Sequence, residues 1–175
     1  MKQAQTSQQW WQEVSKDKEK LHAWLQKQHY GEVQASHRVH ALVDQFRLTG
    51  NIKEKIETIA KDEARHAAWI KEILNARHIE TLPTHEERYW KETMTFTDAI
   101  GAFAVAAHAE KMRLSRIEVI ANDVTAPWDI REAFVKILMD EVLHEKIFRE
   151  LTPKEEYERA RGFHEKGAES LGLTL

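Results

Sequence analysis

Four stretches of the chain repeat apolar residues at alternating steps of three and four, and this pattern constrains the fold more than any other feature of the sequence. Such spacing is typical of an amphipathic helix with one buried face. The predicted apolar stripes span residues 21–46, 52–73, 96–121 and 130–151. Only 6 Gly and 3 Pro interrupt the 175 residues, which favours long helices over short strands. We therefore predict an all-α protein.

Two short segments separate the predicted helices within pairs. Residues 49–51 (Thr-Gly-Asn) follow the first stripe and residues 125–127 (Thr-Ala-Pro) follow the third, and both segments favour a turn. Each pair should therefore form an antiparallel hairpin. The longer segment of residues 75–91, which contains Pro83, can cross the bundle and join the two hairpins.

The length of the chain fits a single domain over residues 1–175, with a bundle core at about 17–151. We predict short extra helices at both ends, over residues 7–14 and from 154 to about 166. The charge-rich stretch 154–161 is interpreted as a solvated helix end.

Composition excludes several classes of protein. The net charge is -3 and Lys and Arg are spread along the chain, so no basic stripe for nucleic acid is expected. The first residues lack the apolar core of a signal peptide, and no run approaches the roughly 18 apolar residues of a membrane span. We expect a cytoplasmic protein without a membrane partner. Zero Cys leaves His and carboxylates as metal ligands.

Polar residues interrupt all four stripes near mid-helix. A lone Glu interrupts the first and third stripes, and a Glu-x-x-His pair, which places two side chains on one helix face, interrupts the second and fourth. The interrupting residues are Glu32, Glu63, His66, Glu110, Glu141 and His144. A third pair, Glu19 and His22, falls off the buried register and about 20 Å along the helix from Glu32, so we interpret it as solvent-facing.

The spacing of these residues places them at one level. Glu32 and Glu63 are 31 residues apart, as are Glu110 and Glu141, and each midpoint falls at a predicted turn. The two halves match at an offset of 78 residues. Four buried carboxylates would repel one another at a cost of several kcal/mol per ion. Two divalent cations would cancel their charge; the alternative is that these polar side chains pair with one another or with Arg.

The motifs resemble those of the ferritin-like di-iron carboxylate superfamily, in which two helices give one Glu each and two give Glu-x-x-His. Residues 32–38 (Glu-Val-Gln-Ala-Ser-His-Arg) are similar to the first helix of rubrerythrins, and residues 60–67 (Ala-Lys-Asp-Glu-Ala-Arg-His-Ala) to the second. The resemblance implies a ferritin-like four-helix bundle of two antiparallel hairpins joined by a long crossover. It also implies two iron ions, with Mn or Zn as substitutes.

By the same resemblance, Glu63 and Glu141 should bridge the two ions, while Glu32 and Glu110 each terminate one. His66 and His144 should each hold one metal. Rubrerythrins commonly carry a further carboxylate one turn after the third-helix Glu, and this chain has Arg113 there. The chain also lacks a cysteine-bearing iron domain, so electrons would come from an external donor.

These residues predict an enzyme, a non-haem di-iron oxidoreductase that reacts with O₂ or peroxide as an oxidase, an oxygenase or a rubrerythrin-like peroxidase. A small organic substrate and a homodimer are compatible with this interpretation. One alternative is a ferritin-like iron-binding protein or ferroxidase that stores or buffers iron. Another is a metal-stabilised bundle without turnover.

Several further residues leave two interpretations open. Asp62 and Asp140 could orient the ligating His or lie in solvent. Arg38 and Arg116 could neutralise the carboxylates or form surface salt bridges. Satisfied or exposed side chains are preferred over a third metal for His37, His40 and His108. Packing or a partner surface is preferred for Trp10, Trp11, Trp24 and Trp69.

Overall fold

The computed structural model describes residues 6–93 and 97–171, apart from the side chain of Glu92. The helices are α1 (Ser7–Lys16), α2 (Lys18–Gln45), α3 (Gly50–Ala76), α4 (Arg88–Thr93), α5 (Ala99–Asn122), α6 (Trp128–Glu150) and α7 (Lys154–Ser170). No strand occurs within these ranges. The all-α prediction is confirmed; its outermost position on the third stripe, Phe96, lies outside the described residues.

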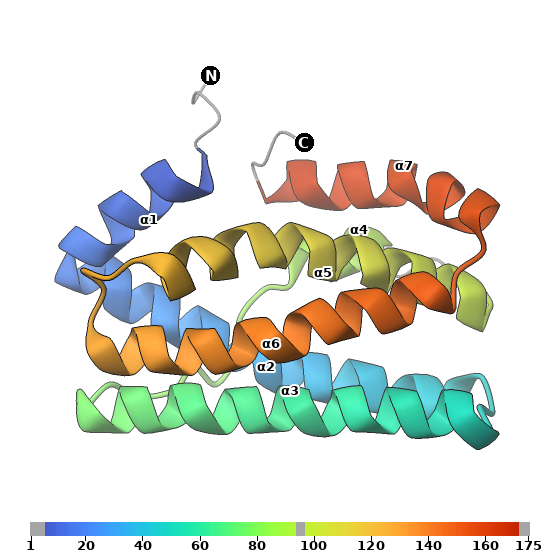
Figure 1. The fold of residues 1–175 in the computed structure, drawn as a ribbon, viewed down its shortest axis with the longest axis horizontal. Coiled ribbons are helices and arrows are strands. Elements are labelled where there is room, and N and C mark those ends of the chain that lie inside the picture. Colours follow the sequence, from blue (N-terminus) through green and yellow to red (C-terminus); the bar gives the residue numbers. More distant parts are fainter. Residues whose placement is uncertain (1–5, 94–96, 172–175) are drawn as a thin grey trace.

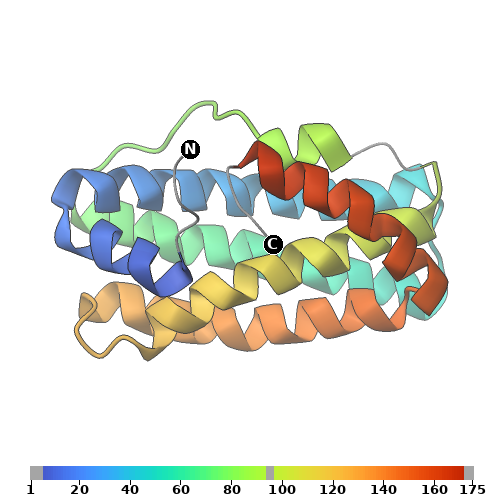
Figure 2. The same ribbon diagram turned by 90° about the horizontal axis from the view of Figure 1, so that it is seen from above.

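Four long helices form the bundle. α2 and α3 run antiparallel side by side, as do α5 and α6, and α3 packs against α6 to join the hairpins (Figure 1). The crossover between α3 and α4 runs along the outside of the bundle past α2 (Figure 2), where Gln26 donates to the Glu80 carbonyl at 2.7 Å. The structure therefore has the ferritin-like arrangement of two hairpins joined by a crossover.

Helix ends follow local sequence signals. Thr6 and Gln9 form a capping box at α1, and Asp17 accepts from the first backbone amides of α2. Asp98 accepts from Gly101 N at 2.8 Å and caps α5. Gly50 begins α3 with φ +57, a left-handed conformation that favours glycine. These caps place the helix starts close to the predicted boundaries.

The terminal helices are longer than predicted, and α7 corrects one interpretation. Residues 154–161 are not merely a solvated helix end, because one face of α7 packs on α5 and α4. Its buried residues are Tyr157, Ala160, His164, Gly167 and Ala168. This cover explains why every residue of α5 from 102 to 110 is buried, which an amphipathic stripe alone would not give. The six-residue helix α4 was not predicted.

Two apolar clusters fill the bundle on either side of the mid-helix level. One contains Leu25, Ile70 and Phe134, and the other contains Ile56 and Phe148, all with 0% or 1% exposure. The stripes are less buried at their outer ends than predicted, with Ile52 and Ile100 each 41% exposed. None of the described helices has the length and apolar character needed to cross a membrane.

Candidate metal centre

The six predicted ligands meet in the layer between the two apolar clusters. Each is at most 5% exposed, although all six carry polar side chains. The donors come from four helices: α2 contributes Glu32, α3 contributes Glu63 and His66, α5 contributes Glu110, and α6 contributes Glu141 and His144. The six residues therefore lie at one level of the bundle, as their spacing in the sequence predicts.

Both imidazoles direct Nδ1 toward the carboxylates. His66 Nδ1 lies 3.6 Å from Glu32 Oε2 and 3.6 Å from Glu141 Oε1. His66 Nδ1 also lies 3.7 Å from Glu63 Oε2, and His144 Nδ1 lies 3.4 Å from Glu63 Oε1 and 3.6 Å from Glu141 Oε2. Glu63 and Glu141 therefore face both imidazoles, as bridging carboxylates would.

The donor set fits a metal by chemistry and by spacing. Glu32, Glu63, His66 and Glu141 each offer one ligand atom, and these atoms lie within 4.8 Å of one another. Donors at about 2.1 Å from one ion are about 3.0–4.2 Å apart when adjacent or opposite, so modest movements would close this group on a cation.

Unsatisfied atoms point to the same cluster. Nine buried side-chain atoms of the described residues lack a hydrogen-bond partner, and all except His29 Nδ1 belong to the six residues. Buried polar atoms are nearly always paired in folded proteins. Of the eight atoms in the cluster, Glu141 Oε1 lies 3.0 Å from Arg113 Nη2. A concentration of buried oxygen and imidazole nitrogen atoms without hydrogen bonds at one level is the arrangement expected of metal ligands.

Asp62 and Asp140 lie behind the imidazoles, in a crossed arrangement. Asp140 Oδ2, from α6, is 3.0 Å from Nε2 of His66 on α3. Asp62 Oδ2, from α3, is 3.3 Å from Nε2 of His144 on α6. A carboxylate at Nε2 keeps the proton there and leaves Nδ1 free as a ligand. The orienting interpretation of both Asp residues therefore has geometric support, and Trp69 stacks on His66 at 5.7 Å between ring centroids.

Arg65 links the two orienting carboxylates. Its Nη2 lies 2.7 Å from Asp62 Oδ1 and 2.8 Å from Asp140 Oδ2. The guanidinium thus connects α3 to α6 outside the ligand layer. The sequence analysis did not predict this role, although Arg65 lies within residues 60–67, which resemble the second helix of rubrerythrins.

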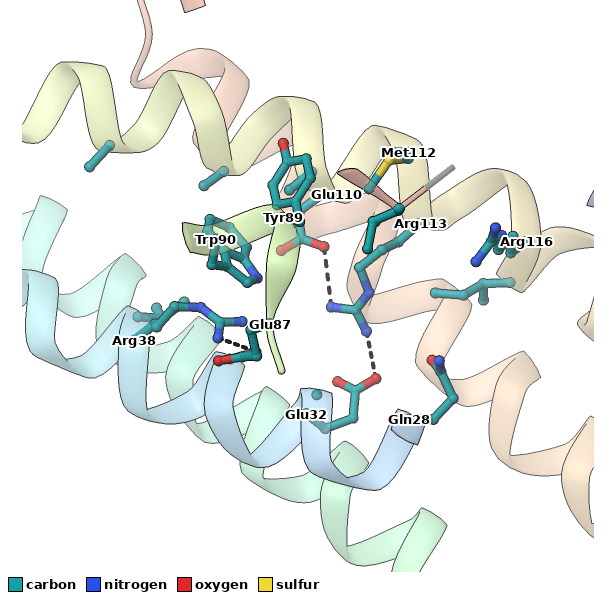
Figure 3. Close-up of a pocket in the computed structure, with 18 of the residues that line it drawn as sticks. Gln28, Glu32, Arg38, Glu87, Tyr89, Trp90, Glu110, Met112, Arg113 and Arg116 are labelled. Carbon is teal, nitrogen blue, oxygen red and sulfur yellow. Dashed lines mark hydrogen bonds and ion pairs between the residues drawn. The ribbon is translucent and has the colours of Figure 1, made fainter. Parts of the chain in front are cut away.

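Arg113 enters the ligand layer itself. Its Nη2 lies 2.5 Å from Glu32 Oε1 and 3.0 Å from Glu141 Oε1. Its Nη1 lies 3.6 Å from Glu110 Oε2 and 3.9 Å from Glu63 Oε2. Figure 3 shows the contacts of Arg113 with Glu32 and Glu110. A single guanidinium therefore contacts all four carboxylates, and the predicted balance of four negative and four positive charges omitted one positive charge.

Arg38 and Arg116 do not take the neutralising role. Arg38 pairs with Glu87 at 2.5 Å and lies over the Trp90 ring, and Arg116 lies over the Trp10 ring. The sequence contained one sign that Arg113 would contact the carboxylates: it stands three residues after Glu110, on the same face of the helix.

The charges in the cluster shift several pKa values. Burial lowers the pKa of His66, but Glu32 and Glu63 outweigh it and raise the pKa to about 10. For His144 burial is likewise outweighed, by Glu141 and Glu63, and the pKa rises to about 11. Burial and then the charge of Glu141 hold the pKa of Glu110 well above its ordinary value. Without metal, the cluster therefore retains protons on both imidazoles.

The remaining candidates lie outside the cluster. Glu19 is exposed and His22 half-buried, and His37 and His40 are exposed. His108 is buried between α5 and α7, with Nε2 2.9 Å from the Tyr157 carbonyl. The rings of Trp10, Trp11 and Trp24 pack together at 5.3–6.0 Å between centroids. These residues serve packing or lie in solvent, as preferred from the sequence.

Comparison with known proteins supports the same conclusion as the geometry. The rubrerythrin family model matches residues 24–152, which is well over half of the chain and includes all six predicted ligands. No curated protein and no solved structure matches the chain. Rubrerythrins are di-iron carboxylate proteins, and the buried Glu and His cluster fits that description. The chain therefore belongs to the rubrerythrin family.

Proposed function

We propose that this chain binds two iron ions at the six-residue cluster and acts as a non-haem di-iron oxidoreductase toward O₂ or peroxide. One observation carries the proposal: eight buried donor atoms of the six residues lack a hydrogen-bond partner. Membership of the rubrerythrin family supports iron as the metal. Bound iron would supply the electron exchange with O₂ or peroxide that carboxylates and imidazoles cannot perform.

The protein side chains would hold and orient the metal centre. Glu63 and Glu141, which face both imidazoles, suit the bridging role, and Glu32 lies beside His66 on one side. Asp140 and Asp62 would keep the imidazole protons on Nε2. The apolar clusters above and below would exclude water from this layer.

Arg113 would act differently from the further carboxylate that rubrerythrins commonly carry. Its guanidinium contacts Glu32 and Glu141, so it competes with a metal for the same oxygen atoms. About a quarter of its side chain (26%) is exposed, toward the cavity beside the cluster. Metal loading would therefore require Arg113 to loosen at least one of these contacts.

The supply of electrons separates the two candidate functions experimentally. These 175 residues contain no Cys, so an enzyme of this kind would depend on a separate donor. Protein loaded with Fe(II) without oxygen should oxidise two iron ions per chain when mixed with O₂ or peroxide, and then stop. A second cycle should begin only after a chemical reductant is added. Ferric absorbance and iron analysis would follow both steps.

An iron store would behave otherwise in the same experiment. It would continue to oxidise added Fe(II) far beyond two ions per chain and would retain the product in a large assembly on size exclusion. Uptake of hundreds of iron ions per chain would replace the enzyme proposal with storage. Failure to bind iron at all would contradict both.

A further inference from the structure

A cavity of about 310 Å³ lies beside the metal cluster, in the space between α2 and α5. α1 packs against both of these helices and closes one end, and Tyr89 and Trp90 of α4 line the other. Most of the lining is apolar, from alanines, aliphatic side chains and three Trp residues. Glu32, Glu110 and Arg113 also line the cavity, so a molecule inside it would lie against the metal ligands (Figure 3).

Three arginines reach this cavity, and two of them are already paired. Arg38 pairs with Glu87, and Arg113 with the cluster carboxylates. Arg116 makes no ion pair among the described residues, and its guanidinium carbon lies 4.8 Å from the centroid of the Trp10 ring. Burial lowers the pKa of Arg116, and no carboxylate offsets that effect. An unpaired guanidinium on an apolar wall is a binding group for an anion.

Gly31 keeps the cavity open on the side of α2. It lies inside a long helix, where glycine is about 1 kcal/mol less favourable than alanine. A Cβ at this position would meet no atom within 4 Å, so packing within the chain does not require glycine. Because Gly31 lines the cavity, a larger side chain there would take up ligand space.

We propose that this cavity binds an apolar organic acid, with the carboxylate on Arg116 and the hydrocarbon part against the aromatic and aliphatic wall next to Glu32 and Glu110. Gln28 also lines the cavity (Figure 3), so its amide is a second polar group available to a ligand. The volume is within the range of about 300–1,000 Å³ for small-molecule sites. A role of this acid as a substrate rests on the proposed function, whereas binding of the acid to the cavity does not depend on that function.

Titration of the full chain with decanoate, in the metal-free and Mn(II)-loaded forms, tests the proposal. Trp10, Trp24 and Trp90 line the cavity, so intrinsic tryptophan fluorescence reports occupancy. Decanoate should bind about tenfold more tightly than decanol, because only the ionised acid can form an ion pair with the Arg116 guanidinium. Equal affinity for the two probes, or no saturable binding of decanoate, would overturn the proposal.

Two matched pairs of variants locate the site. Arg116→Gln should lower the affinity for decanoate about tenfold and leave the affinity for decanol unchanged. Lys111→Gln, which removes the same charge from an exposed position of α5, should change neither affinity. Gly31→Leu should abolish binding of both probes, whereas Gly162→Leu, in open space at an exposed position of α7, should not. Unchanged binding in Gly31→Leu would place the probe elsewhere and refute the site.

Iron counting on the same samples separates this proposal from the proposed function. Decanoate binding by a chain that takes up no iron would retain the acid site and reject the di-iron function. Iron uptake and oxidation without decanoate binding would retain the di-iron function and reject the acid site.

Discussion

Hairpin α2–α3 and hairpin α5–α6 present the same ligands, one lone glutamate and one Glu-x-x-His pair, but they differ three residues after the lone glutamate. The first hairpin has the buried Ala35 at this position, and the second has Arg113, whose guanidinium contacts the carboxylates of both hairpins. A pseudo-twofold repeat can therefore keep its predicted ligands while one substitution changes the charge of the centre.

A second difference lies behind the imidazoles. Arg65 of the first hairpin pairs with Asp62 and Asp140, whereas Leu143, at the matching position of the second, is 48% exposed. The orienting Asp residues themselves are exchanged symmetrically between the hairpins. The repeat is therefore intact at the ligands and their orienting partners, and it is broken by two arginines.

The largest expected effect comes from removing a carboxylate that both hairpins share. Glu63→Ala should reduce bound metal well below two ions per chain, because this side chain faces both imidazoles. Most of the stabilisation by metal, about 4 kcal/mol at a thousandfold excess over Kd, should be lost. Metal analysis and melting curves with and without Mn(II) would measure both. His22→Ala is the control; equal metal loss in that variant would refute the level-matched cluster.

Making the hairpins alike at the differing position should have the next largest effect. Arg113→Ala leaves four buried carboxylates without their guanidinium, which should destabilise the metal-free protein by about 3 kcal/mol. The same variant should bind metal more tightly, since Arg113 no longer competes for Glu32 and Glu141. Denaturant unfolding and metal titration would show opposite changes. Weaker metal binding in Arg113→Ala would show that the guanidinium supports the centre, and Lys111→Ala controls for charge.

The two histidines should respond alike to pH. Their folded pKa values, about 10 and about 11, exceed the ordinary value of 6.5, so their contribution to metal-free stability is complete below about pH 6.5. It is lost progressively as pH rises toward those folded values. Metal binding releases these protons, so affinity should increase about tenfold per proton per pH unit.

Melting temperatures of the metal-free and Mn(II)-loaded chain at several pH values would check this effect. The difference in melting temperature between the two forms should widen from about pH 6.5 to about pH 9, because the metal-free form becomes less stable while the affinity for metal rises. A constant gap would mean that the imidazoles are already neutral without metal.

The smallest expected effect tests the crossed carboxylates. Asp140→Asn and Asp62→Asn should each weaken metal binding about tenfold, because the imidazole loses the partner that orients it. The variants should be similar if the repeat holds, with Asp140→Asn slightly more severe, since its contact of 3.0 Å is shorter than the 3.3 Å of Asp62. Isothermal titration with Mn(II) would compare their affinities with that of Asp44→Asn, at an exposed position of α2. An effect confined to one Asp would show that the hairpins are not equivalent.

The order of residues was enough to predict the helical class, the hairpin pairing and the positions of the six candidate ligands, and the family prediction is confirmed. These features depend on local periodicity and on equal distances from a turn, which are properties of the chain order. Binding of metal by the six residues remains a prediction.

The neighbours that these side chains contact depend on how the helices pack, and the sequence did not predict them. Periodicity places Arg113 and Asp62 on a helix face. It does not predict that Arg113 contacts four carboxylates, or that Asp62 lies within hydrogen-bond distance of His144 in the other hairpin. The cover of α5 by α7 and the cavity between α2 and α5 likewise depend on how helices pack. The physical reason is that a helix fixes the direction of its side chains, whereas their partners depend on the angle and distance of the next helix.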